Sequence, residues 1–225
     1  MGPVCCAACC APHLVGIDGF NRRDACTLAC CVAFPSVMMG LHAGGVTVPR
    51  GVSKLEALYT LGIVNLARGN AVREIKRLTG LRKLGVVGIN KKNCSNFCSA
   101  ISNLSRLESL SVKSDDETGL SGCIDGISSP PSKLESLKLY GNLSKLPEWI
   151  PAVWNLVKLK LRGSRILDHG AAIQLLGNIP NLAILCLWEQ SFEGEEIRLH
   201  FFRDVFPIPE GAGNGSPRGP RICGV

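Results

Sequence analysis

The stretch Leu104-Ser-Arg-Leu-Glu-Ser-Leu-Ser-Val112 carries the pattern that decides the fold, Leu-x-x-Leu-x-x-Leu-x-aliphatic. The pattern occurs six times, with Pro131, Val153 or Ile179 in place of the first leucine in the last three copies. The copies start at residues 55, 78, 104, 131, 153 and 179, so consecutive starts are 22 to 27 residues apart. A period of about 20 to 29 residues with this leucine spacing is typical of leucine-rich repeats.

Each copy ends with two aliphatic residues separated by one position, such as Leu61 and Ile63 in the first copy. Side chains two residues apart on a β-strand point to the same face, so each copy predicts a short strand with two inward side chains. The chain must then return to the next strand, and helical spacing predicts helices in three return segments, 71–78, 97–104 and 171–176. The segment 119–131, with its glycines and prolines, is predicted to be irregular.

These features predict an α/β fold, a leucine-rich-repeat solenoid. Its short parallel strands are expected on the concave face, and its helical or irregular return segments on the convex face. A single copy cannot bury its own leucines, so the copies must stack to make a continuous core.

The two ends of the chain fall outside the repeat pattern. Residues 1–46 lack clear periodicity, and the first 31 residues hold seven of the 12 cysteines. The last 22 residues are rich in glycine and proline, which interrupt regular structure. We predict a poorly ordered Cys/Ala-rich extension over 1–46, a domain of about six repeats over 47–203 and a disordered tail over 204–225.

The composition excludes a wholly disordered chain and a membrane-spanning one. The 225 residues are 46% hydrophobic and only 5% aromatic, so leucine, isoleucine and valine must build the core. The absence of an uninterrupted apolar run of about 18 residues predicts no stable membrane span. The net charge of +7 favours acidic partners. Nucleic acid is not the expected partner, because no nucleic-acid-binding motif accompanies the charge.

We find no group of residues that predicts catalysis. The four histidines, at positions 13, 42, 169 and 200, are far apart in sequence, and none has metal-ligand spacing with another. Cys94 and Cys98 are four residues apart, a spacing that places them on one face of a helix, and a buried structural role is expected for them rather than redox chemistry. The acidic run 115–117 is interpreted as a solvated loop. The sequence therefore predicts no catalytic residue, no metal site and no cofactor, and the chain is not expected to be an enzyme.

The sequence locates the most informative surface on the concave face, where residues flanking the inward aliphatics point outward. By copy, the outward positions are Thr60, Gly62, Val64; Lys83, Gly85, Val87; Ser109, Ser111, Lys113; Ser136, Lys138, Tyr140; Lys158, Lys160, Arg162; and Ile184, Cys186, Trp188. A basic stripe runs through copies three to five, and two aromatic residues, Tyr140 and Trp188, flank it. We predict a protein-binding site there, formed by Lys113, Lys138, Tyr140, Lys158, Lys160, Arg162 and Trp188.

Several repeats resemble those of one protein family more closely than the generic pattern requires. These stretches are 52–65, 73–90, 97–112, 137–150 and 178–196, including the run Leu146-Pro-Glu-Trp-Ile150. They resemble the carboxy-terminal leucine-rich repeats of cereal coiled-coil nucleotide-binding disease-resistance proteins, over roughly residues 47–200. The chain lacks the phosphate-binding loop G-x-x-x-x-G-K-[ST], so it looks like a truncated or rearranged member.

The resemblance implies a cytoplasmic recognition module in plant defence. Its partners would be a pathogen effector, a guarded host protein, or a nucleotide-binding domain in the same or another chain. Two alternatives remain open. An extracellular receptor-like ligand-binding domain is favoured by four glycosylation sequons, at Asn93, Asn103, Asn142 and Asn214. A substrate-recognition subunit of a ubiquitin ligase would require an F-box-like helical segment, which residues 1–46 do not supply.

Overall fold

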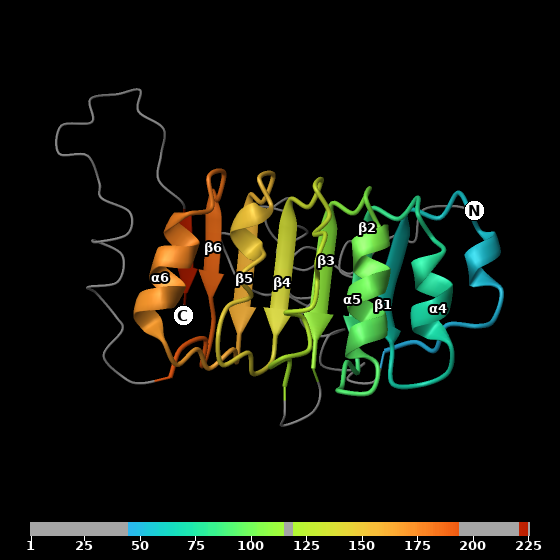
Figure 1. Cartoon of the computed structure of the whole chain (residues 1–225), viewed down its shortest axis with the longest axis horizontal. Coiled ribbons are helices and arrows are strands. Elements are labelled where there is room, and N and C mark those ends of the chain that lie inside the picture. The colour runs from blue at the N-terminus through green and yellow to red at the C-terminus, as the bar shows by residue number, and fades with distance from the viewer. Residues whose placement is uncertain (1–44, 115–118, 194–220, 225) are drawn as a thin grey trace, which may run out of the picture. The chain divides into compact units, whose positions relative to one another are not determined.

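The computed structural model describes residues 45–114, 119–193 and 221–224. The strands in these residues form one parallel sheet in which each strand lies next to the strand that precedes it in the chain (Figure 1). They are β1 (Thr60–Asn65), β2 (Lys83–Val87), β3 (Ser109–Lys113), β4 (Ser136–Tyr140), β5 (Lys158–Arg162), β6 (Ile184–Leu187) and β7 (Arg221–Gly224). The predicted α/β solenoid is therefore confirmed.

In the described residues, the α-helices lie on one face of the sheet (Figure 1). They are α4 (Ala71–Lys76), α5 (Cys94–Asn103) and α6 (His169–Gly177), and the short 3-10 turns are η2 (Val52–Lys54) and η3 (Ile150–Ala152). Each α-helix coincides with a predicted helical segment, and residues 119–131 contain only turns and bends, as predicted. We call the opposite face of the sheet the open face.

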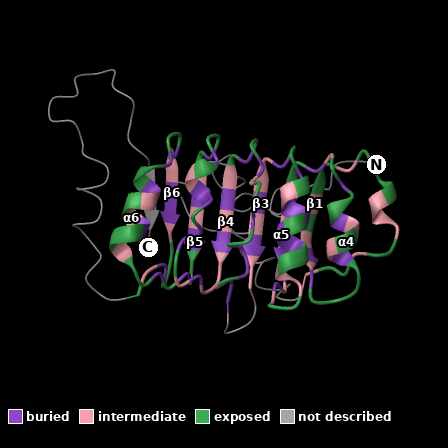
Figure 2. Cartoon of the chain, viewed as in Figure 1, coloured by how far each residue is buried: buried purple, intermediate pink, exposed green. Residues whose placement is uncertain are grey.

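The core lies between the strands and the return segments. The inward leucines of successive copies, such as Leu84, Leu110 and Leu137, are almost completely buried and pack in one cluster with residues of the helices. Figure 2 shows the same division, with buried positions along the strands and exposed positions on the outer sides of the helices. Burial of such side chains contributes about 1.5–3 kcal/mol each, which explains why stacking stabilises copies that are too small to fold alone.

The strands are joined where they begin by a repeated pair of backbone hydrogen bonds. The Tyr59 carbonyl accepts from the N–H groups of Arg82 and Lys83, at 2.8 and 2.9 Å. The carbonyl at the same position of each following copy, in Arg82, Glu108, Glu135 and Val157, also accepts from two consecutive N–H groups of the next copy. Every junction from β1 to β6 is thus made by the same main-chain groups.

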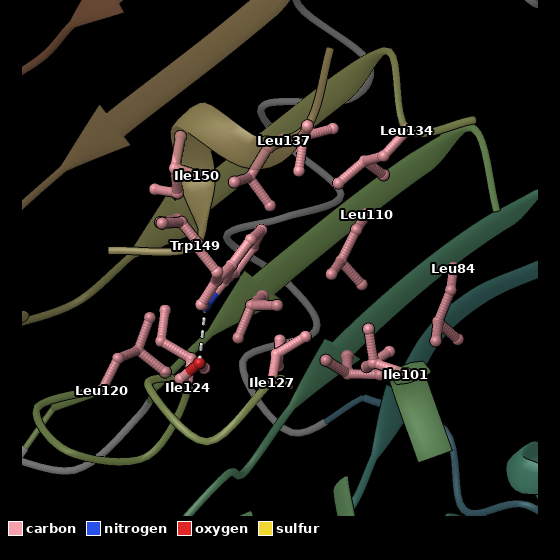
Figure 3. Packing of buried hydrophobic residues seen from close by; sticks show 14 of the residues in the cluster. Leu84, Ile101, Leu110, Leu120, Ile124, Ile127, Leu134, Leu137, Trp149 and Ile150 are labelled. Carbon is pink, nitrogen blue, oxygen red and sulfur yellow. Dashed lines mark hydrogen bonds between the residues drawn. The ribbon is translucent and has the colours of Figure 1, made fainter. Parts of the chain in front are cut away.

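Trp149 fixes the irregular segment that follows β3. Its indole Nε1 donates to the Ile124 carbonyl at 2.9 Å, and both residues are buried. Figure 3 shows the indole beside Leu120, Ile124 and Ile127, with Ile150 next to it on the chain. One side chain therefore packs against this segment and also satisfies a buried carbonyl of a chain section that has no helix of its own.

Side-chain amides and hydroxyls occupy the sharp turns after the strands. The Asn93 amide donates to the carbonyls of Leu66 and Gly88, at 3.1 and 3.0 Å, and thereby connects two copies. Ser191 donates to the Leu161 carbonyl at 3.0 Å. Ser164 is fully buried, and its Oγ has no hydrogen-bond partner within the described residues.

The first strand departs from the predicted alternation. Leu61 pairs with the inward residue Leu84, but the register shifts between Leu61 and Ile63. As a result Ile63 lies opposite the outward residue Gly85, and Val64 lies opposite the inward residue Val86. Val64 is buried, so the expectation that Ile63 points inward and Val64 outward is wrong. An extra residue in a strand reverses the alternation beyond it. Within the described residues, the outer side of β1 is joined by the isolated bridge between Val46 and Val64.

The two ends of the sheet also differ from a simple repeat pattern. Residues Arg221–Gly224 pair in parallel with β6, so the prediction of a disordered tail is wrong for these four residues. The edge of β6 offers unpaired backbone groups, which a short segment without the leucine pattern can satisfy. At the other end of the described residues, Leu55 of the first copy is 55% exposed.

Candidate protein-binding face

The strands carry the candidate site by alternation. In β3, β4 and β5 the second and fourth residues are buried, so the first, third and fifth residues point to the open face. The register then aligns these residues across the sheet. Ser111, Lys138 and Lys160 form one row, and Lys113, Tyr140 and Arg162 form the next.

All seven predicted site residues lie on this face or at its margin. Trp188 follows β6 directly, and its backbone N–H donates to the Leu161 carbonyl at 3.0 Å, which holds it beside Arg162. Lys158 precedes Lys160 by two residues on β5 and faces the same side. The structure thus brings the predicted residues together across β3, β4, β5 and the end of β6, and their role in binding stays a prediction.

Three lysines crowd the centre of the face. Lys138 and Lys160 are register partners on neighbouring strands, which lie about 4.8 Å apart in such sheets. Burial lowers the pKa of Lys138, and the charges of Lys160 and Lys158 lower it further. The charged form of Lys138 is therefore disfavoured by burial first and by like charges second. A carboxylate placed over the three lysines would favour the charged form and raise this pKa.

Two cations lie over Trp188. The Lys160 Nζ lies 5.3 Å from the centre of a Trp188 ring, and the Arg162 Cζ lies 5.6 Å from it. The indole is 37% exposed, so it retains surface that a partner can cover. Cation–π contacts of this kind orient the cations and the ring as one unit, at about 0.5–1 kcal/mol each when exposed.

Tyr140 provides the second aromatic surface. It lies between Lys113 and Arg162 in the register and is half-buried. Burial raises the pKa of Tyr140, with opposition from the Arg162 charge, so the phenol is neutral at physiological pH. The side chain therefore presents an uncharged ring and a hydroxyl donor within a basic surface.

Some features of the face were not predicted. Glu189 places its carboxylate 3.4 Å from the Arg162 guanidinium, so one cation of the stripe is already paired. The pair joins neighbouring copies. In the sequence it is indicated only by position, because Glu189 directly follows Trp188, which occupies in the sixth copy the position that Arg162 has in the fifth. Val87 and Cys186 occupy outward positions yet are buried, so the face is not uniformly exposed.

The next residues to place are the histidines and acidic residues that the sequence analysis considered for metal binding or catalysis. No group of three His, Cys, Asp or Glu residues in the described part of the chain has an arrangement that would hold a metal ion. His169 contacts the Glu193 carbonyl at 2.8 Å and packs edge-on against Phe192. The other three histidines and the acidic run 115–117 lie outside the described residues.

The cysteines and sequons are better defined. Cys98 is buried, as expected, but Cys94 is only half-buried. Asn93 uses its amide within the fold, and Asn142 Oδ1 accepts from the Ser144 N–H at 3.1 Å, while Asn103 is exposed at the end of α5. Asn214 lies outside the described residues.

No helix in the described part of the chain has the length and apolarity that a bilayer crossing requires.

The repeat architecture matches a known family of repeats. A family model described as "Leucine-rich repeat region" matches residues 30–208. A comparison with curated protein sequences found no match. Among solved structures, a leucine-rich-repeat protein of Leptospira interrogans is similar at 15% identity and a TM-score of 0.34, over 72% of this chain and 50% of that one. The chain thus spans half the length of that protein.

Proposed function

The chain belongs to the leucine-rich-repeat family, and from this premise we propose that it is a non-catalytic module that recognises an acidic protein surface through its open face. The observation that carries the proposal is the cluster formed by Lys138, Lys160, Arg162 and Trp188, in which two of the cations lie over one exposed indole. Trp, Tyr and Arg are the residues most enriched at the energetic centres of protein interfaces.

The cations and the aromatics have separate roles in this proposal. A partner that covers Trp188 and Tyr140 removes apolar surface from water, which supplies affinity. The lysines attract an acidic surface and exclude a basic one, so they set the association rate and the choice of partner. Lys138 lies at the centre of this charged group, as the register partner of Lys160 on one side and of Ser111 on the other.

We further propose that the module acts in plant defence, in the cytoplasm. This finer assignment is supported by the resemblance of residues 47–200 to cereal disease-resistance repeats, which implies a pathogen effector, a guarded host protein or a nucleotide-binding domain as the partner. The cytoplasmic assignment is supported by the thiols of Cys98 and Cys123, which are not in disulfides, and by the Asn93 sequon, whose amide is bonded within the fold.

Charge reversal on the open face tests the proposal. The variant K138E/K160E/R162E is compared with a matched triple on the helical face, R73E/R77E/K92E, whose cations are exposed. Both variants change the net charge equally, so any difference between them reports the location of the charges. Both are first checked for an unchanged melting temperature and circular dichroism spectrum.

The readout is quantitative capture from healthy and infected cereal tissue, followed by association rates measured with each captured protein. We expect the open-face triple to slow association by about 10- to 100-fold and to weaken its salt dependence, because electrostatic steering contributes factors of this size. The helical-face triple should bind like the unmodified chain. Equal binding by all three proteins would show that the basic stripe is only a solvated surface.

A further inference from the structure

Three cysteines of the described chain meet between two neighbouring copies. Cys94 is the first residue of α5, and Cys98 lies one turn later on the same face of the helix. Cys123 belongs to the irregular segment of the next copy, and the Cys98 Sγ donates to its carbonyl at 3.2 Å. This bond holds the backbone at residue 123 against the helix face that also carries Cys94.

The three thiols differ in their surroundings. Cys98 and Cys123 are buried, whereas Cys94 is half-buried, with its Sγ donating to the Lys91 carbonyl at 3.4 Å. Burial is the main cause that raises the pKa of Cys123 to about 11, and the neighbouring thiols of Cys94 and Cys98 add to it. Because Cys94 and Cys98 share one helix face and the Cys98 Sγ reaches the Cys123 carbonyl, the three cysteines form one cluster between the two copies.

We propose that Cys94 and Cys123 form a peroxide-responsive thiol pair, in which Cys94 is oxidised first and Cys123 then joins it in a disulfide. The proposal rests on one accessible thiol that lies beside a protected one, with Cys98 keeping the segment in place. The assignment is independent of the open face, because these residues lie on α5 and its neighbouring return segment.

The chemistry balances with a hydroperoxide as the oxidant. The Cys94 thiolate attacks the peroxide, an S–O bond forms, the O–O bond breaks and hydroxide or alkoxide leaves, so that sulfur becomes a sulfenic acid. The Cys123 thiol then gives up its proton and attacks the Cys94 sulfur. An S–S bond forms, the S–O bond breaks and water leaves. A thiol reductant then reduces the Cys94–Cys123 disulfide back to two thiols.

The pair would act as a clamp within the repeat domain. A Cys94–Cys123 disulfide connects α5 to the segment held by Trp149, and these elements belong to consecutive copies. Because the stability of a solenoid depends on interfaces between neighbouring copies, a covalent link across one of them stabilises both. Oxidation is therefore expected to raise the melting temperature by several degrees, reversibly.

The experiment uses the full reduced chain, a small excess of hydrogen peroxide, alkylation of the remaining thiols and tryptic digestion without reductant. Trypsin releases residues 93–106, with Cys94 and Cys98, and residues 114–133, with Cys123. We expect these two peptides to be linked in the unmodified chain and in the control C98S, and not in C94S or C123S. In C123S, a 1,3-dione probe should label the sulfenic acid on peptide 93–106.

A measurement without variants guards against folding defects. The native chain should give at least about ten-fold more of the linked peptide than the chain oxidised in guanidinium, where proximity is lost and all 12 cysteines compete. Linkage that survives in C94S, linkage that disappears in C98S, or equal yields from native and unfolded chains would each overturn the proposal.

Discussion

Trp149 provides the sharpest test of how the irregular part of the solenoid is held. The substitution Trp149→Phe keeps an aromatic ring but removes the indole N–H and the volume of the pyrrole ring. The Ile124 carbonyl, which accepts from Nε1 at 2.9 Å, is then left buried without this donor. Among the residues drawn in Figure 3, the Trp149 indole is the donor joined to this carbonyl by a dashed line.

The expected loss has two parts. An unsatisfied buried carbonyl costs about 1–3 kcal/mol. The missing ring atoms remove apolar contacts of roughly one or two methylene groups, or about 1–2 kcal/mol. Together they predict a decrease of about 3 kcal/mol in the free energy of unfolding, which corresponds to a drop in melting temperature of about 6–12 °C for a domain of this size.

Trp154→Phe is the matched control, because Trp154 is 70% exposed and its indole forms no described hydrogen bond. The same chemical change there is expected to alter stability by no more than about 0.5 kcal/mol. Unfolding is followed in urea by circular dichroism, and hydrogen exchange of residues 119–131 reports where the loss occurs. Trp149→Phe should accelerate exchange in that segment before it affects β5 and β6. If the two variants were equally stable, burial of Leu120, Ile124 and Ile127 alone would hold the segment, and the hydrogen bond would contribute nothing.

Two further predictions concern groups that the fold leaves unsatisfied. Lys138→Met should raise stability at neutral pH, because the folded protein holds the Lys138 pKa below its ordinary value and thus disfavours the charged form. In the unmodified chain this cost in folding free energy is complete below the folded pKa of Lys138, and it disappears as the pH rises towards about 10.4, the unfolded value. Denaturation measured across this range should therefore show that the stability of the unmodified chain rises with pH, and the variant should lack this rise. Ser164→Ala should stabilise the chain by about 1 kcal/mol in urea denaturation, since it removes a buried hydroxyl that lacks a partner. Ser191→Ala, which removes a donor to the Leu161 carbonyl, should destabilise it by a similar amount, and the same sign for both serines would contradict the reasoning.

The leucine spacing predicts most of the fold because each copy encodes its own strand. In β2 to β6 the aliphatic pairs, for example Leu137 and Leu139, occupy the inward positions that alternation requires. The prediction is wrong where pairing with a distant segment decides the structure. The register shift between Leu61 and Ile63 and the pairing of residues 221–224 with β6 both depend on non-local backbone contacts, which no local pattern contains.

The candidate face is predictable at the level of side and order. Alternation places Lys138 and Lys160 outward, and the repeat phase makes them neighbours. The position of Trp188 beneath two cations depends on side-chain rotamers, and the Arg162–Glu189 pair crosses the register diagonally. Neither follows from spacing, because the same sequence permits several rotamers that only packing selects.

The paired hydrogen bonds at the start of each strand have a consequence for how such a surface can change. The carbonyls of Arg82, Glu108, Glu135 and Val157 connect the copies, while their side chains range from cationic to acidic to aliphatic. These main-chain hydrogen bonds therefore do not depend on the type of side chain at this position. A copy can be exchanged, duplicated or rewritten at its outward positions without loss of the scaffold, provided that its inward leucines remain. The architecture separates the information that specifies shape from the information that specifies a partner, so new binding specificities can arise by shuffling whole copies.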